Sequence, residues 1–466
     1  RCGRCARRRR RDRESVRDER DMSQAFDLKV IARQIFQQTL AGIDIAETLC
    51  RKLARQGTHI HCVGRYFDLA HYKQIKIIAL GKASPAMAEG LQNILAPDFS
   101  ASGILVASAP PSRRLNNFQE FISGHPVPNE QSFAAARAIL EMLRESDRAD
   151  TLIFFLLSGG GSSLVELPLD PEIPLADFQS LHRALVSCGG SIDEINSVRK
   201  HLSAVKGGRL AAAAPHATKI TLAVTDVPEG RESALASGPT LPDPTTAADA
   251  RHVIEQYALR EKLPASIAST LSAAEALPET PKANHAAYHN AHFEIILGMH
   301  DLFHHAHINA ESAGFHTICD NTTDDWPIPR ATEFLLADLS RLAKECSGQP
   351  VAIIADGEVS SPVLGNGVGG RNSAFVLDCV NKIAGKNIAV LSAGTDGIDG
   401  VSPAAGAVAN GETLARAAVA KLDPQDFARR SDSYNFFAAL DDAIITGPTG
   451  NNLRDLRILL AVPEEL

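Results

Sequence analysis

Short apolar runs recur along the chain, and five of them stop directly before a polar segment that contains glycine. Between these runs the apolar residues recur at helical spacing, so predicted strands alternate with predicted helices. This alternation predicts an α/β protein with largely parallel, doubly wound sheets. Ligands bind such sheets beyond the carboxyl ends of the strands, so the five segments together predict one ligand site. With their polar ends, the runs cover residues 75–84, 151–163, 219–230, 350–360 and 387–400.

Two changes in pattern divide the chain. Residues 1–21 carry ten arginines, five acidic residues and no core-forming pattern, which predicts a disordered basic extension. A helical pattern followed by a proline-bearing polar stretch at 261–285 predicts a domain boundary. We therefore expect an N-terminal Rossmann-like domain over 22–282 and a C-terminal α/β domain over 283–466, which the apolar run 293–298 begins.

Length and charge restrict the function classes. Of the 466 residues, those beyond residue 21 include 37 basic and 50 acidic ones, a net charge of −13, which argues against a nucleic-acid partner. The longest apolar run, Leu152 to Leu157, is far shorter than the ~20 residues that span a membrane. The eight cysteines are scattered, as in reduced intracellular proteins. We predict a cytoplasmic protein with small-molecule ligands, for which a homodimer stays open.

A glycine-rich segment directly follows the apolar run 152–157. Three consecutive glycines allow backbone N–H groups to converge on an anion, and the flanking serines add hydroxyl donors. The alternative is a tight strand-to-helix turn. The segment is neither a Walker A loop nor the G-x-S-x-G elbow of serine hydrolases. The predicted phosphate-binding residues are Ser158, Gly159, Gly160, Gly161, Ser162 and Ser163.

Two lysines are candidate phosphate contacts. Lys82 follows the apolar run 75–80, where its ammonium would enter the crevice as a point charge. Lys206 lies in a basic helical pattern that Gly207-Gly208 is expected to break, because a glycine pair costs a helix ~1–2 kcal/mol. For both lysines a solvent-exposed position is the alternative.

Four carboxylates stand just after predicted strands, where α/β enzymes present metal ligands or a general base. They are Asp226, Glu358, Asp396 and Asp399. Asp-Gly pairs are also ordinary turn residues, so a turn is the alternative.

The segment Gly365–Gly370 matches G-x-G-x-x-G and precedes a predicted helix. It starts seven residues after Glu358 and not at a strand end, so it is weak evidence for a dinucleotide site. Arg371, at the start of that helix, is better suited to clamp a phosphoryl group or a carboxylate bidentately.

Together these segments resemble the class II glycerate kinase family, whose C-terminal part is the MOFRL domain. The resemblance implies an ATP- and Mg²⁺-dependent kinase that phosphorylates D-glycerate, most often to the 2-phosphate, with two α/β domains around an interdomain cleft. The motifs follow the family order from about residue 28 onward. They are GKAS (81–84), GHPVPNE (124–130), LLSGGGSSL (156–164), NSVRKHLSAVKGGRLA (196–211), TDVPEG (225–230), ASGPT (236–240), DGEVS (356–360), GGRN (369–372), GTDGIDG (394–400), AAGA (404–407) and TGPTG (446–450).

By motif, the resemblance places Lys82, Arg371 and Asp396 at the family's proposed catalytic positions. It places Asp226 and Glu358 at acidic positions, where they are candidate metal ligands, and Asp226 also belongs to the expected substrate site. The remaining expected site residues are Asn372 and Asp399 toward the substrate, and Lys206 with Ser158–Ser163 toward the nucleotide.

The chain departs from the family pattern at three places. Ser373-Ala374 replace the usual Gln-Glu, Glu229-Gly230 replace Gly-Asp, and Pro403 replaces the acid before AAGA. Each change removes or displaces a polar group, so a catalytically impaired member of the family is an alternative.

Two other functions stay open. An NAD(P)H-dependent hydroxypyruvate reductase is the leading alternative, because relatives of the family have carried that label. It predicts an acid about twenty residues after the glycine motif, where position 390 is Val. A binding protein without activity would leave Lys82 and Arg371 without a chemical task.

Overall fold

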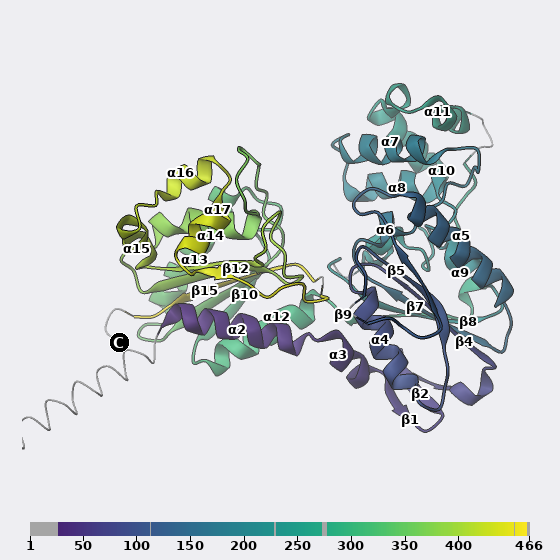
Figure 1. Ribbon diagram of the computed structural model, residues 1–466, viewed down its shortest axis with the longest axis horizontal. Helices are drawn as coiled ribbons and strands as arrows, with labels where there is room; N and C mark the ends of the chain where they lie inside the picture. The colour runs from purple at the N-terminus through teal and green to yellow at the C-terminus, as the bar shows by residue number, and fades with distance from the viewer. Residues whose placement is uncertain (1–26, 112, 228–229, 273–276, 452, 464–466) are drawn as a thin grey trace, which may run out of the picture. The chain divides into compact units, whose positions relative to one another are not determined.

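The computed structural model describes residues 27–111, 113–227, 230–272, 277–451 and 453–463. The predicted basic extension 1–21 and the departure at Glu229 lie outside these residues. The chain forms two compact units (Figure 1). We call Ile43–Met299 with Gly450–Leu453 the parallel-sheet unit. The described residues up to Gly42, with His300–Thr449 and those from Arg454 on, form the mixed-sheet unit.

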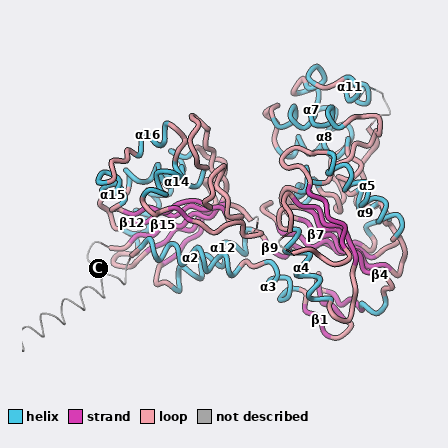
Figure 2. Tube along the Cα trace, in the orientation of Figure 1, coloured by secondary structure: helices cyan, strands magenta, loops and turns pink. Residues whose placement is uncertain are grey.

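The parallel-sheet unit is built on a six-stranded sheet, whose strands are magenta in Figure 2. Each strand runs parallel to its neighbours. In spatial order they are β6 (Phe118–Ile122), β5 (Ser102–Ala107), β4 (Gln74–Leu80), β7 (Thr151–Leu157), β8 (Thr218–Val224) and β9 (Ala291–Leu297). All seven residues of β7 are buried, as expected for a central strand that helices cover on both faces. The predicted parallel sheet is confirmed here.

Helices complete the parallel-sheet unit. Helix α5 (Glu130–Glu145) packs into the cluster that Phe155 and Val106 form on one face of the sheet. Helix α4 (Ser84–Leu95) contacts β4, β5 and β7. A second apolar cluster joins helices outside the sheet, among them α7, α8 and α10. The other elements are α3 (Ile45–Lys52), β1 (Ala54–Gln56), β2 (His59–Cys62), β3 (Arg65–Asp68), α6 (Gly161–Leu164), α7 (Leu175–Val186), α8 (Ile192–Leu202), α9 (Arg209–Ala212), α10 (Ala247–Gln256) and α11 (Ala265–Ser272).

The mixed-sheet unit differs from the prediction of a largely parallel sheet. Its strands β10 and β11 are parallel, and each later pair in the sheet is antiparallel. Because β11 and β12 both pair antiparallel to β15, they point the same way, and their carboxyl ends flank the first residue of β15, Asp455. The order is β10 (His316–Asp320), β11 (Val351–Asp356), β15 (Asp455–Ala461), β12 (Ile388–Gly394), β13 (Gly406–Asn410) and β14 (Ala443–Ile444).

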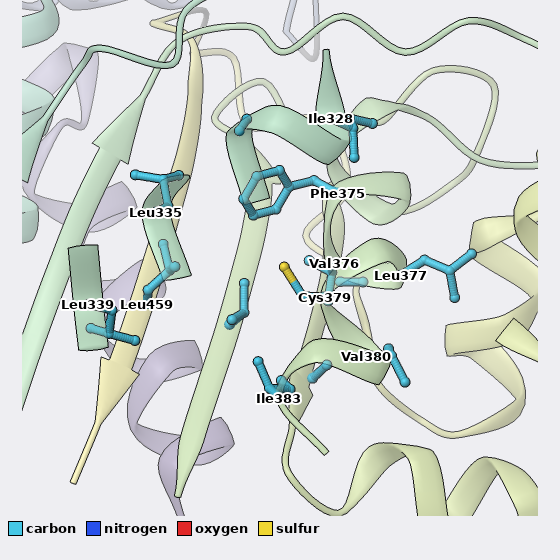
Figure 3. Packing of buried hydrophobic residues seen from close by; sticks show 14 of the residues in the cluster. Ile328, Leu335, Leu339, Phe375, Val376, Leu377, Cys379, Val380, Ile383 and Leu459 are labelled. Atoms are coloured by element: carbon cyan, nitrogen blue, oxygen red, sulfur yellow. The ribbon is translucent and has the colours of Figure 1, made fainter. Parts of the chain in front are cut away.

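The core of this unit lies between the sheet and helices α13 and α14. Phe375 and Cys379 stand one turn apart on α14, fully buried beside Leu335 of α13 and Leu459 of β15 (Figure 3). Each such side chain contributes ~1.5–3 kcal/mol when it leaves water. The remaining helices are α2 (Leu28–Gly42), α12 (Met299–Ser312), α13 (Ile328–Glu345), α14 (Arg371–Lys382), α15 (Thr413–Val419), α16 (Pro424–Arg429) and α17 (Ser433–Ala439).

The units differ from the predicted domains at both ends. Strand β9 was assigned to the second domain, but it pairs with β8, so the parallel-sheet unit continues to Met299. Helix α2 was assigned to the first domain, but it contacts β12, β13 and β15. The sequence of a strand does not show which neighbour its backbone will pair with, and the sequence of a helix does not show which sheet its apolar face will cover.

Candidate active site

The parallel-sheet unit gathers one group of predicted site residues at a single edge. Strands β4, β7 and β8 are adjacent and parallel, so their carboxyl ends lie together. Lys82, the segment Ser158–Ser163 and Asp226 follow these three ends. Asp226 is partly buried, in a turn where the Val227 N–H donates to Thr225 Oγ1 at 3.0 Å.

The glycine-rich segment is bound directly to the loop that carries Lys82. The Lys82 N–H donates to the Gly159 carbonyl at 2.9 Å, and the Ala83 N–H donates to Ser158 Oγ at 2.9 Å. Gly81 has φ +121°, and a Cβ there would lie 2.2 Å from Ser158 Oγ. The two loops can meet at this distance because residue 81 has no side chain.

His125 is a neighbour of Lys82 that the sequence analysis did not select. A Cβ at Gly160 would lie 3.1 Å from His125 Cδ2 and 3.4 Å from Lys82 Cγ, so both side chains flank this glycine. Desolvation lowers the pKa of His125, and the charge of Lys82 lowers it further. A neutral imidazole therefore stands beside the ammonium at pH 7. The segment GHPVPNE contained the signal, but its histidine was given no role.

Lys206 was predicted to bind phosphate, and the structure places it elsewhere. Its side chain is 1% exposed, and Nζ contacts the Ser162 carbonyl at 2.7 Å, the Val165 carbonyl at 3.2 Å and Glu166 Oε2 at 2.7 Å. These three acceptors match the three hydrogens of an ammonium. Lys206 therefore fixes residues 162–166, which follow the glycines, and its ammonium is directed at these residues and not at a phosphate ligand.

Glu166 is the centre of this buried group. It also contacts His182 Nε2 at 3.2 Å and accepts from Ser203 Oγ at 2.5 Å. Burial would raise the pKa of Glu166, but Lys206 and His182 outweigh burial and hold that pKa at about 2. The carboxylate is therefore ionised and supports the phosphate loop without facing a ligand.

The helical pattern is broken as predicted, but helix α8 already ends at Leu202, before the glycine pair. Gly207 and Gly208 have φ +56° and +83° directly before α9 begins. Ser237 links α8 to the glycine-rich segment, because its Oγ lies 3.0 Å from Ser162 Oγ and donates to Asn196 Oδ1 at 3.0 Å.

The mixed-sheet unit gathers a second group at the edge where β11 and β12 end. Arg371 donates from Nη1 to Glu358 Oε2 at 2.7 Å and from Nε to Asp455 Oδ2 at 2.5 Å. Burial would lower the pKa of Arg371, but Asp455 and Glu358 raise it, so the guanidinium stays charged. Asp455 was not selected from the sequence, because nothing in the run NNLRDLR marks the residue that enters β15 beside this edge.

Asp396 lies beside the same edge. Its side chain is partly buried and accepts from the Ile398 N–H at 3.1 Å. A Cβ at Gly394 would lie 3.1 Å from Asp396 Oδ1 and 3.4 Å from Asp455 Oδ1, so the two carboxylates flank one glycine. Asp396, Glu358 and Arg371 are therefore brought together as predicted within this unit.

Asp399 and Asn372 have structural contacts in place of the predicted substrate contacts. The buried Asp399 carboxylate accepts from the N–H groups of Asn372 and Ser373, both at 2.9 Å, and from Ser373 Oγ at 2.6 Å. Asn372 Oδ1 accepts from Ser392 Oγ at 2.6 Å. Asp399 thus caps α14, and Asn372 joins that helix to β12. The family departure at Ser373 takes part in this cap.

The glycine motif 365–370 lacks the geometry of a dinucleotide site. Its Gly367 N–H donates to the Arg430 carbonyl and its Val368 N–H to Asp432 Oδ1, both at 2.9 Å. The first N–H groups of α14 are occupied by Asp399. The donors that would hold a pyrophosphate are therefore already used. Gly365, Gly367 and Gly369 pack closely against residues 430–434, and Gly370 packs against Asp399.

Among the described residues, no three His, Cys, Asp or Glu side chains are arranged to hold a metal ion. Mg²⁺ commonly takes one or two carboxylates and completes its octahedron with phosphate oxygens and water. Asp226, at the end of β8, suits such a limited role. Glu358 would have to leave Arg371 to serve in this way.

In the part of the chain that the structure describes, no helix is long and apolar enough to cross a membrane.

Comparisons with known proteins agree with both units. The family model "Domain of unknown function (DUF4147)" matches residues 31–272, and the model "MOFRL family" matches residues 351–455. The D-glycerate 2-kinase of Thermotoga maritima is 35% identical over 84% of this chain and 91% of its own. A putative hydroxypyruvate reductase of Agrobacterium vitis is 37% identical over 82% of this chain and 86% of its own. The crystal structure of a Thermotoga maritima glycerate kinase covers 93% of this chain and 99% of its own, with TM-score 0.80 and 32% identity.

Proposed function

The chain belongs to the glycerate kinase family with DUF4147 and MOFRL domains, as its motifs had suggested, and from this premise we propose that it transfers the γ-phosphoryl group of ATP to D-glycerate. The expected product is 2-phosphoglycerate, the product implied by relatives named glycerate 2-kinase. A cytoplasmic location, where ATP and Mg²⁺ are available, is part of the proposal, and a homodimer stays a prediction.

One observation carries the proposal: Lys82 and the glycine-rich segment are joined at the carboxyl edge of a parallel sheet. Backbone N–H groups of such a segment bind phosphate oxygens, and an adjacent ammonium offsets their charge. We assign the nucleotide phosphates to Ser158–Ser163 and Lys82. We do not assign Lys206 to the phosphates, because its ammonium binds Glu166 and the Ser162 carbonyl.

The transfer requires a base and the stabilisation of negative charge from the protein. A glycerate hydroxyl attacks the γ-phosphorus, the bond to the β,γ-bridging oxygen breaks, ADP leaves, and the hydroxyl proton passes to a base. We assign that proton to the carboxylate of Asp396, which lies at the end of β12. Arg371 and Lys82 stabilise negative charge on the phosphoryl oxygens and on the substrate carboxylate.

Mg²⁺ is the expected cofactor, since it neutralises the triphosphate and orients it for transfer. Asp226 would contribute one carboxylate oxygen to the ion, and Glu358 is the second candidate. Removal of divalent ions by a chelator should abolish turnover, and added Mg²⁺ should restore it. Full turnover after exhaustive chelation would contradict this assignment.

A coupled assay tests the proposal directly. Glycerate with ATP should give ADP, whereas hydroxypyruvate with NADH or NADPH should give no nucleotide oxidation above background. The result opposite in both respects would favour the reductase. The described contacts of the glycine motif 365–370 do not favour that alternative, because the N–H groups of Gly367, Val368 and Asn372 are bonded within the protein.

A further inference from the structure

The guanidinium of Arg371 is held by two carboxylates that differ in exposure. The Asp455 side chain is 4% exposed and touches two guanidinium nitrogens, Nε at 2.5 Å and Nη2 at 3.3 Å. The Glu358 side chain is 44% exposed and touches Nη1 at 2.7 Å. Asp455 is therefore enclosed and binds the guanidinium along its Nε–Nη2 side, while the half-exposed Glu358 binds the terminal nitrogen Nη1.

The backbone explains why Asp455 is the fixed partner. Asp455 is the first residue of β15, and its backbone pairs with Gly394 of β12 inside the sheet. A carboxylate on a buried strand has few rotamers to choose from, whereas a half-exposed glutamate side chain has many. The Glu358 N–H donates to Asp324 Oδ1 at 2.8 Å, which fixes the backbone of Glu358.

Hydrogen counting shows what remains for a ligand. A guanidinium has five N–H donors. Asp455 takes one on Nε and one on Nη2, and Glu358 takes one on Nη1. One hydrogen remains on each of the two terminal nitrogens, Nη1 and Nη2. These nitrogens form the fork that binds carboxylate or phosphate bidentately, and Glu358 occupies part of it. Arg371 is itself 35% exposed in its side chain, so this fork can be reached.

We propose that Asp455 is a positioning residue that holds Arg371 side-on and so presents its terminal fork to an oxyanion of the substrate, which displaces Glu358. The inference rests on the proposed function, because it concerns the arginine assigned to the phosphoryl group or the glycerate carboxylate. It adds a residue outside the motifs, and it separates a permanent partner of Arg371 from an exchangeable one.

Chemical rescue tests whether Asp455 can hold a guanidinium group at this position. Arg371→Ala should lower kcat about 10²–10³-fold, and guanidinium ion, bound by Asp455 in the vacated space, should restore turnover at least tenfold. Adding Asp455→Asn to Arg371→Ala should remove this rescue. Adding Asp442→Asn should keep it, because Asp442 is an equally enclosed carboxylate of the same unit that pairs with Arg416 and Lys29, both at 2.8 Å, and not with Arg371. Equal rescue with and without Asp455 would overturn the proposal.

A second measurement uses the intact arginine. Asp455→Asn should lower kcat at least tenfold with little change in KM for ATP, and Asp455→Glu should recover part of the loss. Loss of kcat from general unfolding would appear equally in Asp442→Asn and in the thermal melting curves. An unchanged kcat in Asp455→Asn would overturn the proposal while leaving the kinase assignment intact. Normal turnover of Arg371→Ala without guanidinium would instead reject the role of Arg371 and the proposal with it.

Discussion

Lys206 and Arg371 are both cations of the glycine-rich motifs, yet the structure gives them opposite situations. Lys206 is 1% exposed, and its three hydrogens meet three acceptors. Arg371 is 35% exposed, and two carboxylates leave part of its fork available. A basic residue in a phosphate-type motif can therefore support the site or act in it, and its unused donors distinguish the two cases.

The largest effect is expected on the stability of the protein, when the buried ion pair between Lys206 and Glu166 is broken. Glu166→Gln would leave Lys206 charged and buried without its carboxylate, which should lower the free energy of unfolding by about 3–5 kcal/mol at pH 7. The native contribution should be complete above pH 4.5, the ordinary pKa of a glutamate, and fall as the pH approaches about 2, the pKa in the folded protein. Denaturant titrations between pH 2.5 and 7 measure both trends.

The double variant Glu166→Gln/Lys206→Met is the control, because it removes both charges. It should recover much of the lost stability. If it is no more stable than Glu166→Gln, the ion pair is not the source of the effect and the comparison with Arg371 fails.

Arg371→Lys should sharpen the contrast from the other side. Lysine keeps the charge but cannot be held side-on while presenting a second bidentate face, so kcat should fall about 10²-fold with a small change in stability. Steady-state kinetics and a melting curve on the same sample measure both. A loss confined to KM for ATP would reassign Arg371 to ground-state binding.

The two aspartates of the segment GTDGIDG extend the comparison to carboxylates. Asp396→Asn keeps the shape and removes the proton-accepting charge, so turnover should fall about 10²-fold while ATP still binds. Single-turnover kinetics with a nucleotide-binding titration test this. Near-normal kcat in this variant would remove the general-base assignment.

The smallest effect is expected for Asp399→Asn. An amide can no longer accept from both N–H groups of α14 and from Ser373 Oγ, so stability should fall by about 1–3 kcal/mol while kcat changes little. Abolished turnover in a folded Asp399→Asn protein would exchange the roles of the two aspartates.

The sequence predicted the local parts of this structure well. The apolar runs that became β4, β7, β8, β11 and β12 end where expected, and the break at Gly207-Gly208 is present. These features depend on neighbours in the chain: a short apolar run forms a buried strand, and a glycine pair is unfavourable inside a helix. Placing Lys82, Ser158–Ser163 and Asp226 together required only the assumption of one parallel sheet.

Distant pairings could not be predicted in the same way. The contact between Lys206 and Glu166 joins residues forty positions apart, and the contact between Arg371 and Asp455 spans 84. Neither acid differs in its local pattern from a solvent-exposed one. The residues of β15 do not show in which direction the strand runs. This direction places Asp455 between the ends of β11 and β12 and makes the second sheet mixed.

Helix α2 is synthesised long before the strands on which it packs. Its Arg33 donates from Nη1 to the Ala443 carbonyl at 3.1 Å, 410 residues later, and its apolar face rests on β12, β13 and β15. At about 5–20 residues per second, a ribosome needs roughly 20–80 s to make the intervening chain. During that interval the strands of the parallel-sheet unit can already pair, whereas Phe36 and its apolar neighbours on α2 have no surface to cover them. Among the described helices, the earliest in the chain is thus one of the last to be buried, and the growing chain exposes an amphipathic segment that chaperones can hold.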